Sequence, residues 1–178
     1  LIPALVAGYE VGGLFEELLA SETTPKGFRA TTLYGTGAAA AAVARLHRMD
    51  VERTCAALGN AVSFSGGLLQ CFAEGTDEWR YQVGITAQAG WSAAELAHAG
   101  SVSLREGYEG ANGLARAFAG RRLDAAVVRA RIGQEWQTLR VAFKPFPVCA
   151  FNQTPVIAAL ALRDKLDGRK IEAAVVQM

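Results

Sequence analysis

The feature that most constrains the fold is a run of glycine and alanine early in the chain, Gly35-Thr-Gly-Ala-Ala-Ala-Ala-Ala42. Alanine has the highest helix propensity of all residues, so the run predicts a helix from Thr36 to His47. Side chains this small make a thin helix, which a neighbouring helix can approach closely. We therefore expect this helix to lie at the centre of a helical bundle.

The same run can also be interpreted as a dinucleotide-binding fingerprint of the form GxGxxA. In that motif a strand and a glycine turn lead into a helix whose N-terminus binds a pyrophosphate. Residues 1–20, however, carry apolar side chains at helical intervals, and the segment from Val51 onward is helical in pattern. No second strand that ends in an acidic residue follows about 20 residues later. We favour core packing over nucleotide binding.

Apolar periodicity and capping residues predict further helices. Asp50 is a suitable N-cap for a helix from Val51 to about Leu69, and Gly100 is a suitable C-terminal glycine for a helix that ends at about His98. Shorter helices are expected at residues 113–118, 123–131 and 154–166. Strands are expected where side chains alternate, at residues 136–143 and 171–178.

The spacing of apolar side chains changes from a helical period to an alternating one near residue 136, and this change divides the chain into two parts. We predict a mainly α fold with a helical domain at residues 1–135, followed by the beginning of a smaller α+β domain at residues 136–178. The sequence opens at Leu1 as if within a hydrophobic helix, and it ends as if within a strand. We therefore expect it to be a fragment of a longer protein.

Composition excludes several classes of function. Of the 178 residues 51% are apolar, which is enough to bury a core, and 18 basic against 17 acidic residues give a net charge of +1. That balance argues against binding to nucleic acid or to an anionic membrane. No apolar run approaches the ~20 residues of a membrane span. We expect a cytoplasmic protein.

The few residues that bind metals in other proteins do not form a recognisable motif here. Cys55, Cys71 and Cys149 include no CxxC pair, so we expect free thiols in a reducing compartment. His47 and His98 have no carboxylate or cysteine at metal-ligand spacing. We expect surface or capping histidines and no metal site.

The first candidate for a functional site is the stretch Trp79-Arg-Tyr-Gln82, which precedes a helix of small residues. The guanidinium of Arg80 can bind a carboxylate through two parallel hydrogen bonds. Arg29 is a second possible anion contact. The alternative is an ordinary helix start in which Glu78 and Arg80 are solvated and the aromatic rings are packed, and the residues alone favour this alternative.

The second candidate is the segment Lys144-Pro-Phe-Pro-Val-Cys149. The residue before a proline is excluded from the α region, so this backbone is extended and stiff. Lys144 on such a segment can anchor an anion, or it can act as a base where burial lowers its pKa. A surface lysine beside a rigid linker explains the pattern equally well.

Several stretches occur together in a fixed order. They are Leu5-Val-Ala-Gly-Tyr-Glu-Val11, Gly27-Phe-Arg-Ala-Thr31, Gly35-Thr-Gly-Ala-Ala-Ala40, Gly84, Ala87-Gln-Ala-Gly90, Ala93-Ala-Glu-Leu-Ala97, Glu109-Gly110 and Lys144-Pro-Phe-Pro-Val-Cys149. In this order they resemble the MmgE/PrpD family, which contains 2-methylcitrate dehydratases, cis-aconitate decarboxylases and iminodisuccinate epimerases. The resemblance implies a large helical domain, a smaller α+β lid with the site between them, a homodimer and no cofactor.

The chemistry that the resemblance implies is removal of a proton or carboxylate next to a carboxylate in a small polycarboxylic acid. Dehydration, as by the 2-methylcitrate dehydratases of propionate metabolism, is the leading reaction. Isomerisation, epimerisation and decarboxylation are the alternatives within the family. A different class also stays open, a catalytically silent helical homologue that dimerises or binds a ligand.

This sequence departs from the family at several positions. Members commonly carry lysine where this chain has Trp79, and histidine where it has Arg29, Gln82 and Gln153, whereas Lys144 is retained. We therefore expect Lys144 to be the catalytic or anchoring residue. The expected substrate contacts are Arg80, Arg29, Trp79, Gln82, Tyr81 and Gln153.

Overall fold

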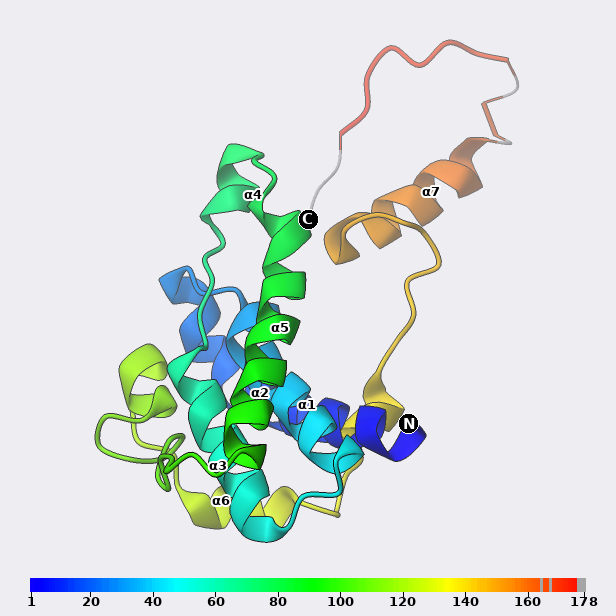
Figure 1. Cartoon of the computed structure of the whole chain (residues 1–178). Coiled ribbons are helices and arrows are strands. Elements are labelled where there is room, and N and C mark those ends of the chain that lie inside the picture. The colour runs from blue at the N-terminus through cyan, green and yellow to red at the C-terminus, as the bar shows by residue number, and fades with distance from the viewer. Residues whose placement is uncertain (164, 167, 176–178) are drawn as a thin grey trace. The chain divides into compact units, whose positions relative to one another are not determined.

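A computed structural model describes residues 1–163, 165–166 and 168–175 of the chain. The protein is mainly α-helical, as the sequence predicts. The chain forms two compact units, one from Leu1 to Arg140 and one from Val141 onward (Figure 1). The division into a helical domain at 1–135 and an α+β domain at 136–178 stays a prediction.

The first unit contains six α-helices and three short helical turns among its residues, all of which are described. The α-helices are α1 (Ile2–Thr23), α2 (Ala30–Leu46), α3 (Val51–Ser63), α4 (Gln70–Glu74), α5 (Glu78–His98) and α6 (Ala125–Arg131). The turns are the 3-10 helix η1 (Thr24–Lys26), the π-helix η2 (Ala115–Ala119) and the 3-10 helix η3 (Gln137–Arg140). The described part of the second unit contains η4 (Ala150–Asn152) and α7 (Gln153–Arg163).

Helix α2 is the centre of the first unit, since α1, α3 and α5 all pack against it. Its small residues permit this close approach. A Cβ atom added to Gly90 of α5 would overlap the carbonyl oxygen of Thr36 and the methyl group of Ala39, and one added to Gly8 of α1 would lie 2.9 Å from the carbonyl oxygen of Ala38. The prediction of a central helix is confirmed, and the glycines of the dinucleotide-like motif lie inside that helix.

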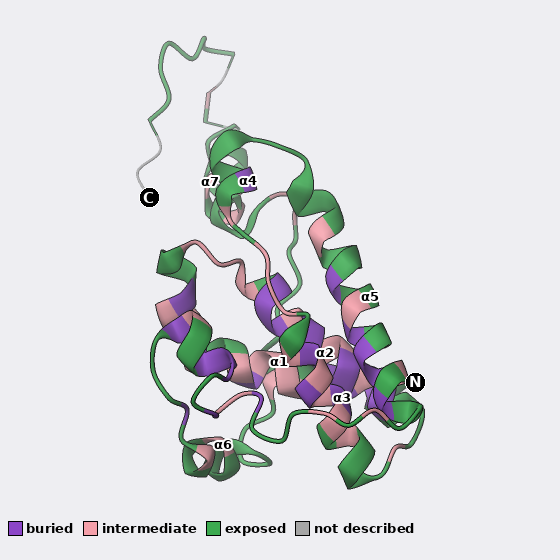
Figure 2. Ribbon diagram, turned by 60° about the vertical axis from the view of Figure 1, so that its left-hand side comes forward, coloured by how far each residue is buried: buried purple, intermediate pink, exposed green. Residues whose placement is uncertain are grey.

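Apolar side chains bury both sides of α2. One cluster joins α1 and α2 to the segment 114–123, and it consists of Leu19, Leu33, Tyr34, Leu114, Ala115, Ala119 and Leu123. The other joins α2 to α3 and α5, and it consists of Val43, Ala44, Ala57, Ala94 and Ala97. In α5 the buried residues begin only at Thr86, so its N-terminal turns are largely exposed (Figure 2).

Two predicted caps are confirmed. The Oδ1 atom of Asp50 accepts a hydrogen bond from the backbone N–H of Arg53 at 2.8 Å, which satisfies an otherwise unpaired donor at the start of α3. Gly100 follows α5 with a φ of 91°, and the N–H of Ser101 returns to the carbonyl of Leu96 at 3.0 Å. This left-handed glycine ends the helix in the way that glycine commonly does.

Several helix boundaries differ from the prediction. Helix α5 begins at Glu78 and therefore includes residues 79–82, which were expected to precede it. Helix α2 begins at Ala30 rather than Thr36, and α3 ends at Ser63 rather than at about Leu69. The boundaries of α2 and α3 lie beside a long-range backbone pairing, in which the N–H of Arg29 donates to the carbonyl of Gly67 at 3.0 Å and the N–H of Leu69 donates to the carbonyl of Gly27 at 2.8 Å. Gly67 has a φ of 129°, so the chain turns away from the helical path before Leu69.

The two predicted strands are wrong for the residues that the structure describes. Gln137–Arg140 form η3 within the predicted strand 136–143, because the start of this turn binds a carboxylate of α1. Residues 171–175 have no regular secondary structure, and residues 176–178 of the second predicted strand lie outside the described residues.

Glu10 of α1 holds η3 in place. Its two carboxylate oxygens accept hydrogen bonds from the backbone N–H groups of Gln137 and Thr138, at 2.9 and 2.8 Å, and the Thr138 hydroxyl donates to it at 2.6 Å. Burial raises the pKa of Glu10, but these hydrogen bonds outweigh burial and hold its pKa below the usual value. Glu17 adds an ion pair to Arg140 at 3.0 Å.

A matched pair of glycines on α5 tests the close packing. Gly90→Ala should lower the free energy of unfolding by about 1–3 kcal/mol, because its Cβ has no room against α2. Gly84→Ala should raise it by about 0.5–1 kcal/mol, because a Cβ there meets no atom within 4 Å and alanine favours the helix. Urea unfolding of both variants measures the difference, and equal effects would contradict the packing argument.

The lowered pKa of Glu10 leads to a second prediction, which concerns how the stability of the protein depends on pH. A pKa that is lower in the folded than in the unfolded state contributes stability above the unfolded value, 4.5, and this contribution is lost as the pH falls through the folded pKa. Glu10→Gln should therefore cost about 1 kcal/mol at pH 7, and less as the pH falls below about 4.5. Chemical unfolding from pH 7 to pH 3 measures this, and a cost that does not change with pH would refute the assignment.

Candidate functional site

A pocket of about 280 Å³ opens in the first unit beside the N-terminal half of α5. Its walls come from the start of α2, the loop after α3 and the exposed turns of α5. The lining residues are Thr32, Phe64, Gly66, Gly67, Glu78, Tyr81, Gln82, Ile85, Thr86 and Ala89. Two residues that the sequence predicts as substrate contacts, Tyr81 and Gln82, are therefore part of this pocket.

The loop after α3 is shaped by its two glycines. Gly67 lies so close to α2 that an added Cβ would overlap the hydroxyl of Thr32, and its positive φ favours glycine as well. A Cβ added to Gly66, in contrast, would meet no atom within 4 Å. The loop therefore packs tightly on α2 through one glycine, while the other borders the open space of the pocket.

Arg29, at the start of α2, is linked by hydrogen bonds to the first turn of α5. Its Nη1 atom donates hydrogen bonds to the backbone carbonyl of Trp79 at 2.9 Å and to the Oε1 atom of Gln82 at 2.8 Å. The guanidinium also lies 5.1 Å from the ring centroid of Phe72, a favourable cation–π distance. Gln82 in turn donates to the carbonyl of Leu68 at 3.2 Å. Arg29 and Gln82 thus join three segments beside the pocket.

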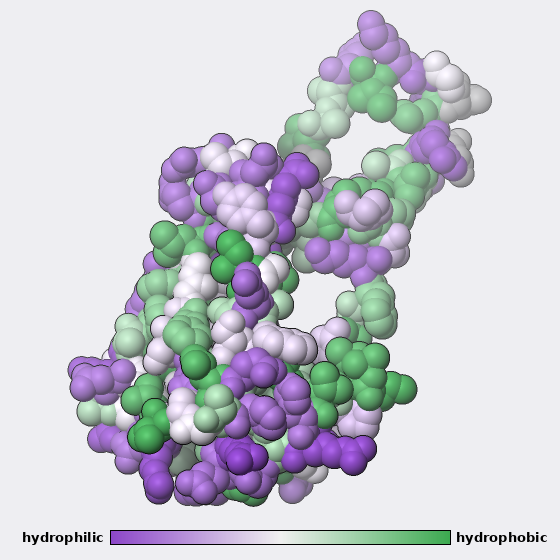
Figure 3. Space-filling model, in the orientation of Figure 1, coloured by the Kyte–Doolittle hydropathy of each residue, from purple (hydrophilic) through white to green (hydrophobic). Residues whose placement is uncertain are grey.

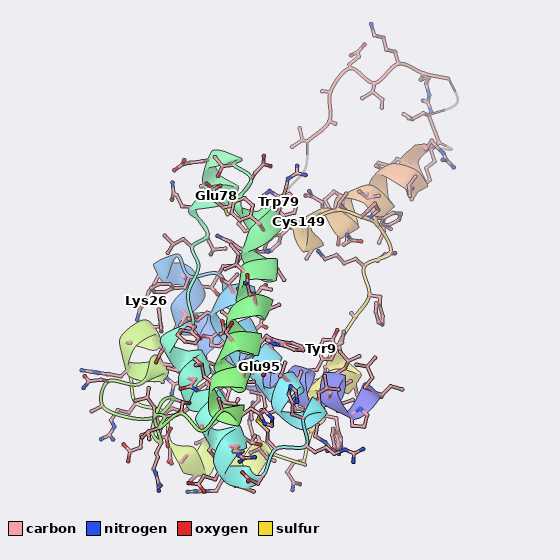
Figure 4. The ribbon with its side chains drawn as sticks, viewed as in Figure 1. Tyr9, Lys26, Glu78, Trp79, Glu95 and Cys149 are labelled. Carbon is pink, nitrogen blue, oxygen red and sulfur yellow. The ribbon has the colours of Figure 1, made fainter. Side chains whose placement is uncertain are left out.

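Arg80 and Trp79 lie next to this pocket on the surface and are not among its lining residues. The Nε atom of Arg80 lies 2.7 Å from the Oδ1 atom of Asp77, and the side chains of this pair are 66% and 77% exposed. The guanidinium also lies 5.0 Å from the ring centroid of Trp79. Figure 4 places Trp79 and Glu78 at the N-terminal end of α5. Arg80 is therefore a solvent-facing cation with a partner of its own.

The polar groups in the lining differ in their protonation. A hydrogen bond from the Thr76 side chain lowers the pKa of Glu78, so this carboxyl is ionised at neutral pH. Desolvation, together with the carboxylates of Glu78 and Asp77, raises the pKa of the Tyr81 phenol, so this hydroxyl stays neutral. The lining of the pocket therefore includes the negative charge of Glu78 and the neutral hydroxyl of Tyr81.

The other predicted site residues, Lys144 and Gln153, belong to the second unit. Lys144 is exposed in a segment without regular structure. The side-chain amide of Gln153 binds the turn that precedes it in the chain. Its Nε2 atom donates to the carbonyls of Phe146 and Val148 at 3.0 and 3.1 Å, and its Oε1 atom accepts from the N–H of Phe146 at 3.2 Å. A shared site with Arg29 stays a prediction.

Sequence reasoning missed the apolar wall of the pocket, which consists chiefly of Phe64 and Ile85. Ile85 is 58% exposed and Phe64 is 45% exposed, although both side chains are large and apolar. The pair Gly66-Gly67, which follows Phe64 and Ser65, is the signal that could have revealed this wall, because paired glycines indicate a turn at the end of the preceding helix.

The residues described by the structure do not form a group of three or more His, Cys, Asp or Glu that could hold a metal ion. His47 instead pairs with Glu95 at 2.9 Å and stacks on His98 with ring centroids 5.0 Å apart. Within the same residues, no helix combines the length and apolar character needed to cross a membrane.

Comparison with known families adds an independent finding. The sequence matches the family described as MmgE/PrpD N-terminal domain over residues 1–125. The match contains α1 to α5 and every residue that lines the pocket, whereas Lys144 and Gln153 lie beyond it. No protein with curated annotation matches the chain.

Variants of the two arginines beside the pocket test whether the hydrogen bonds of Arg29 hold the first turn of α5 in place. Arg29→Lys should lower the free energy of unfolding by about 1 kcal/mol and speed amide exchange at residues 79–82, because lysine cannot reproduce the two hydrogen bonds of Nη1. Arg80→Lys, whose ion pair is exposed, should change stability by less than about 0.5 kcal/mol. Hydrogen exchange and urea unfolding measure both, and equal exchange in the two variants would contradict the role of Arg29.

Proposed function

The chain belongs to the MmgE/PrpD family, and on that basis we propose that it is an enzyme, or part of one, that acts on a small di- or tricarboxylic acid. The family includes dehydratases and related enzymes. We propose a reaction that begins by removing a proton from the carbon next to a carboxylate. Dehydration is the leading reaction, and we also propose that the protein works as a homodimer without a cofactor.

The chemistry of such a dehydration defines what the site must supply. A base takes the α-proton, the electron pair of the broken C–H bond forms the double bond, and the β-hydroxyl leaves with a proton as water. Negative charge develops on the carboxylate as the proton leaves, so a nearby cation lowers the barrier. We propose Lys144 for this role, as anchor or as base, and the arginines Arg29 and Arg80 as carboxylate contacts.

The observation that carries the proposal is the family match over the helices that form the pocket. Arg29 supports it: its Nη1 atom donates hydrogen bonds to Trp79 and Gln82, and we propose that its Nε and Nη2 atoms bind a carboxylate of the substrate. Tyr81 adds a neutral hydroxyl donor. Isomerisation, epimerisation and decarboxylation begin in related ways and are the alternatives within the family.

A second candidate function rests on a specific observation. Where the family commonly carries histidine, Arg29 and Gln82 bind each other and the backbone. These contacts suit a structural role better than proton transfer. A catalytically silent homologue that binds a ligand or dimerises is therefore the competing proposal.

Turnover decides between the two candidates. The protein should dehydrate 2-methylcitrate or a related hydroxy acid, measured by the absorbance of the new double bond. Lys144→Ala should lower kcat/KM by about 10²–10⁴-fold, the usual contribution of a positioned acid–base group. Lys170→Ala, which removes another exposed lysine of the second unit, should leave turnover unchanged.

Unchanged turnover in Lys144→Ala would refute the role of that lysine. The absence of turnover with every polycarboxylate tested, in a protein that is folded by circular dichroism, would favour the silent homologue.

A further inference from the structure

The pocket beside α5 has an apolar wall that is only partly covered. Phe64 and Ile85 supply the largest side chains of this wall, and Ala89 and the two glycines of the loop leave the space between them open. Phe64 and Ile85 remain about half exposed. Figure 3 shows hydrophobic residues (green) interspersed with hydrophilic ones (purple) on the surface of the first unit. A ligand that covers this wall would gain the free energy of burying apolar surface.

The charges around the pocket do not favour an acidic group inside it. Of the described residues that line it, the charged one is Glu78, which is ionised. The nearest cations, Arg29 and Arg80, do not line the pocket: Arg29 donates to Gln82 and to a backbone carbonyl, and Arg80 pairs with Asp77. A carboxylate placed within the pocket would meet a like charge, whereas an uncharged hydrocarbon would not.

We infer that this pocket binds an apolar substituent of the substrate, an alkyl or aryl group larger than methyl, while the carboxylates of the substrate lie outside it. The inference rests on the proposed function, because it adds a substituent to the acid that the enzyme would transform. The substrate class is thus a small di- or tricarboxylic acid with a hydrocarbon side group.

The size and lining of the pocket agree with such an occupant. Sites for small molecules are concave and mostly apolar, with a few polar groups that set orientation, and a volume of about 280 Å³ is near the lower end of their usual range. Here the Tyr81 hydroxyl and the Gln82 amide are those polar groups. They can orient the polar end of an acid whose side group fills the apolar part.

A series of succinates tests the inference by binding alone. The probes are succinate, methylsuccinate, butylsuccinate and phenylsuccinate, titrated calorimetrically into the full chain. Burying a methylene contributes about 0.8 kcal/mol, which corresponds to a roughly fourfold change in Kd. We expect Kd to fall about twofold to fourfold for each added methylene. Equal affinity for succinate and butylsuccinate would overturn the inference.

Two glycine variants locate the effect. Gly66→Leu places a side chain in the open space of the pocket and should abolish the dependence of Kd on chain length. Gly84→Leu is the matched control, because a Cβ there also meets no atom within 4 Å and Gly84 does not line the pocket. The control should keep the dependence. Retention of the dependence in Gly66→Leu, or its loss in Gly84→Leu, would overturn the inference.

A third variant tests the wall without filling the pocket, in case Gly66→Leu does not fold. Ile85→Ser removes apolar surface from an exposed helical position and should reduce the gain per methylene by about half or more. An unchanged gain would contradict the assignment of Ile85 to the binding wall.

The inference and the proposed function fail in different ways. Turnover of polycarboxylates by a protein whose affinity does not depend on chain length would overturn the inference and leave the proposed function standing. The opposite result is also possible: affinity rises with the length of the side group, this rise is lost in Gly66→Leu, and the protein turns over none of these acids. That result would support the assignment of the pocket and overturn the proposed enzymatic function.

Discussion

The close approach of helix backbones to α2 is the interaction on which the first unit depends. Gly8 of α1 and Gly90 of α5 meet this helix at positions where a larger residue would collide with backbone or methyl atoms. Because α2 is held on both sides, the position of α5 along it is fixed. The buried part of α5 begins at Thr86, so its first two turns extend beyond the packed helices and form one wall of the pocket. Helix packing therefore determines where the pocket lies.

The features of the fold that could be predicted from the sequence are those set by interactions between residues close together in the chain. The glycine and alanine run predicted the central helix, and Asp50 and Gly100 predicted the ends of two others, because propensity and capping act within a few residues. The errors occur at long-range contacts. The pairing of Arg29 with Gly67 lies beside the start of α2 and the end of α3, and Glu10 of α1 turns the predicted strand at 136–143 into η3.

The candidate site was predicted in part. Tyr81 and Gln82 line the pocket, and the sequence identified them through their position before a helix of small residues. The hydrogen bonds by which Arg29 joins α2 to α5 were not predictable, since its partners lie about 50 residues away in the chain. Gln153, predicted as a substrate contact, binds its own turn, and any contact with substrate stays a prediction together with the role of Lys144.

The hydrogen bonds between Arg29, Gln82 and the backbone have a consequence for how the protein responds to acidity. An imidazole at either position would change its charge between pH 5 and 8, and the first turn of α5 would loosen or tighten with it. A guanidinium and a carboxamide keep the same charge over this range, so the hydrogen bond between Arg29 and Gln82 does not depend on pH there. The contacts that hold the first turn of α5 therefore give the pocket no dependence on pH over this range.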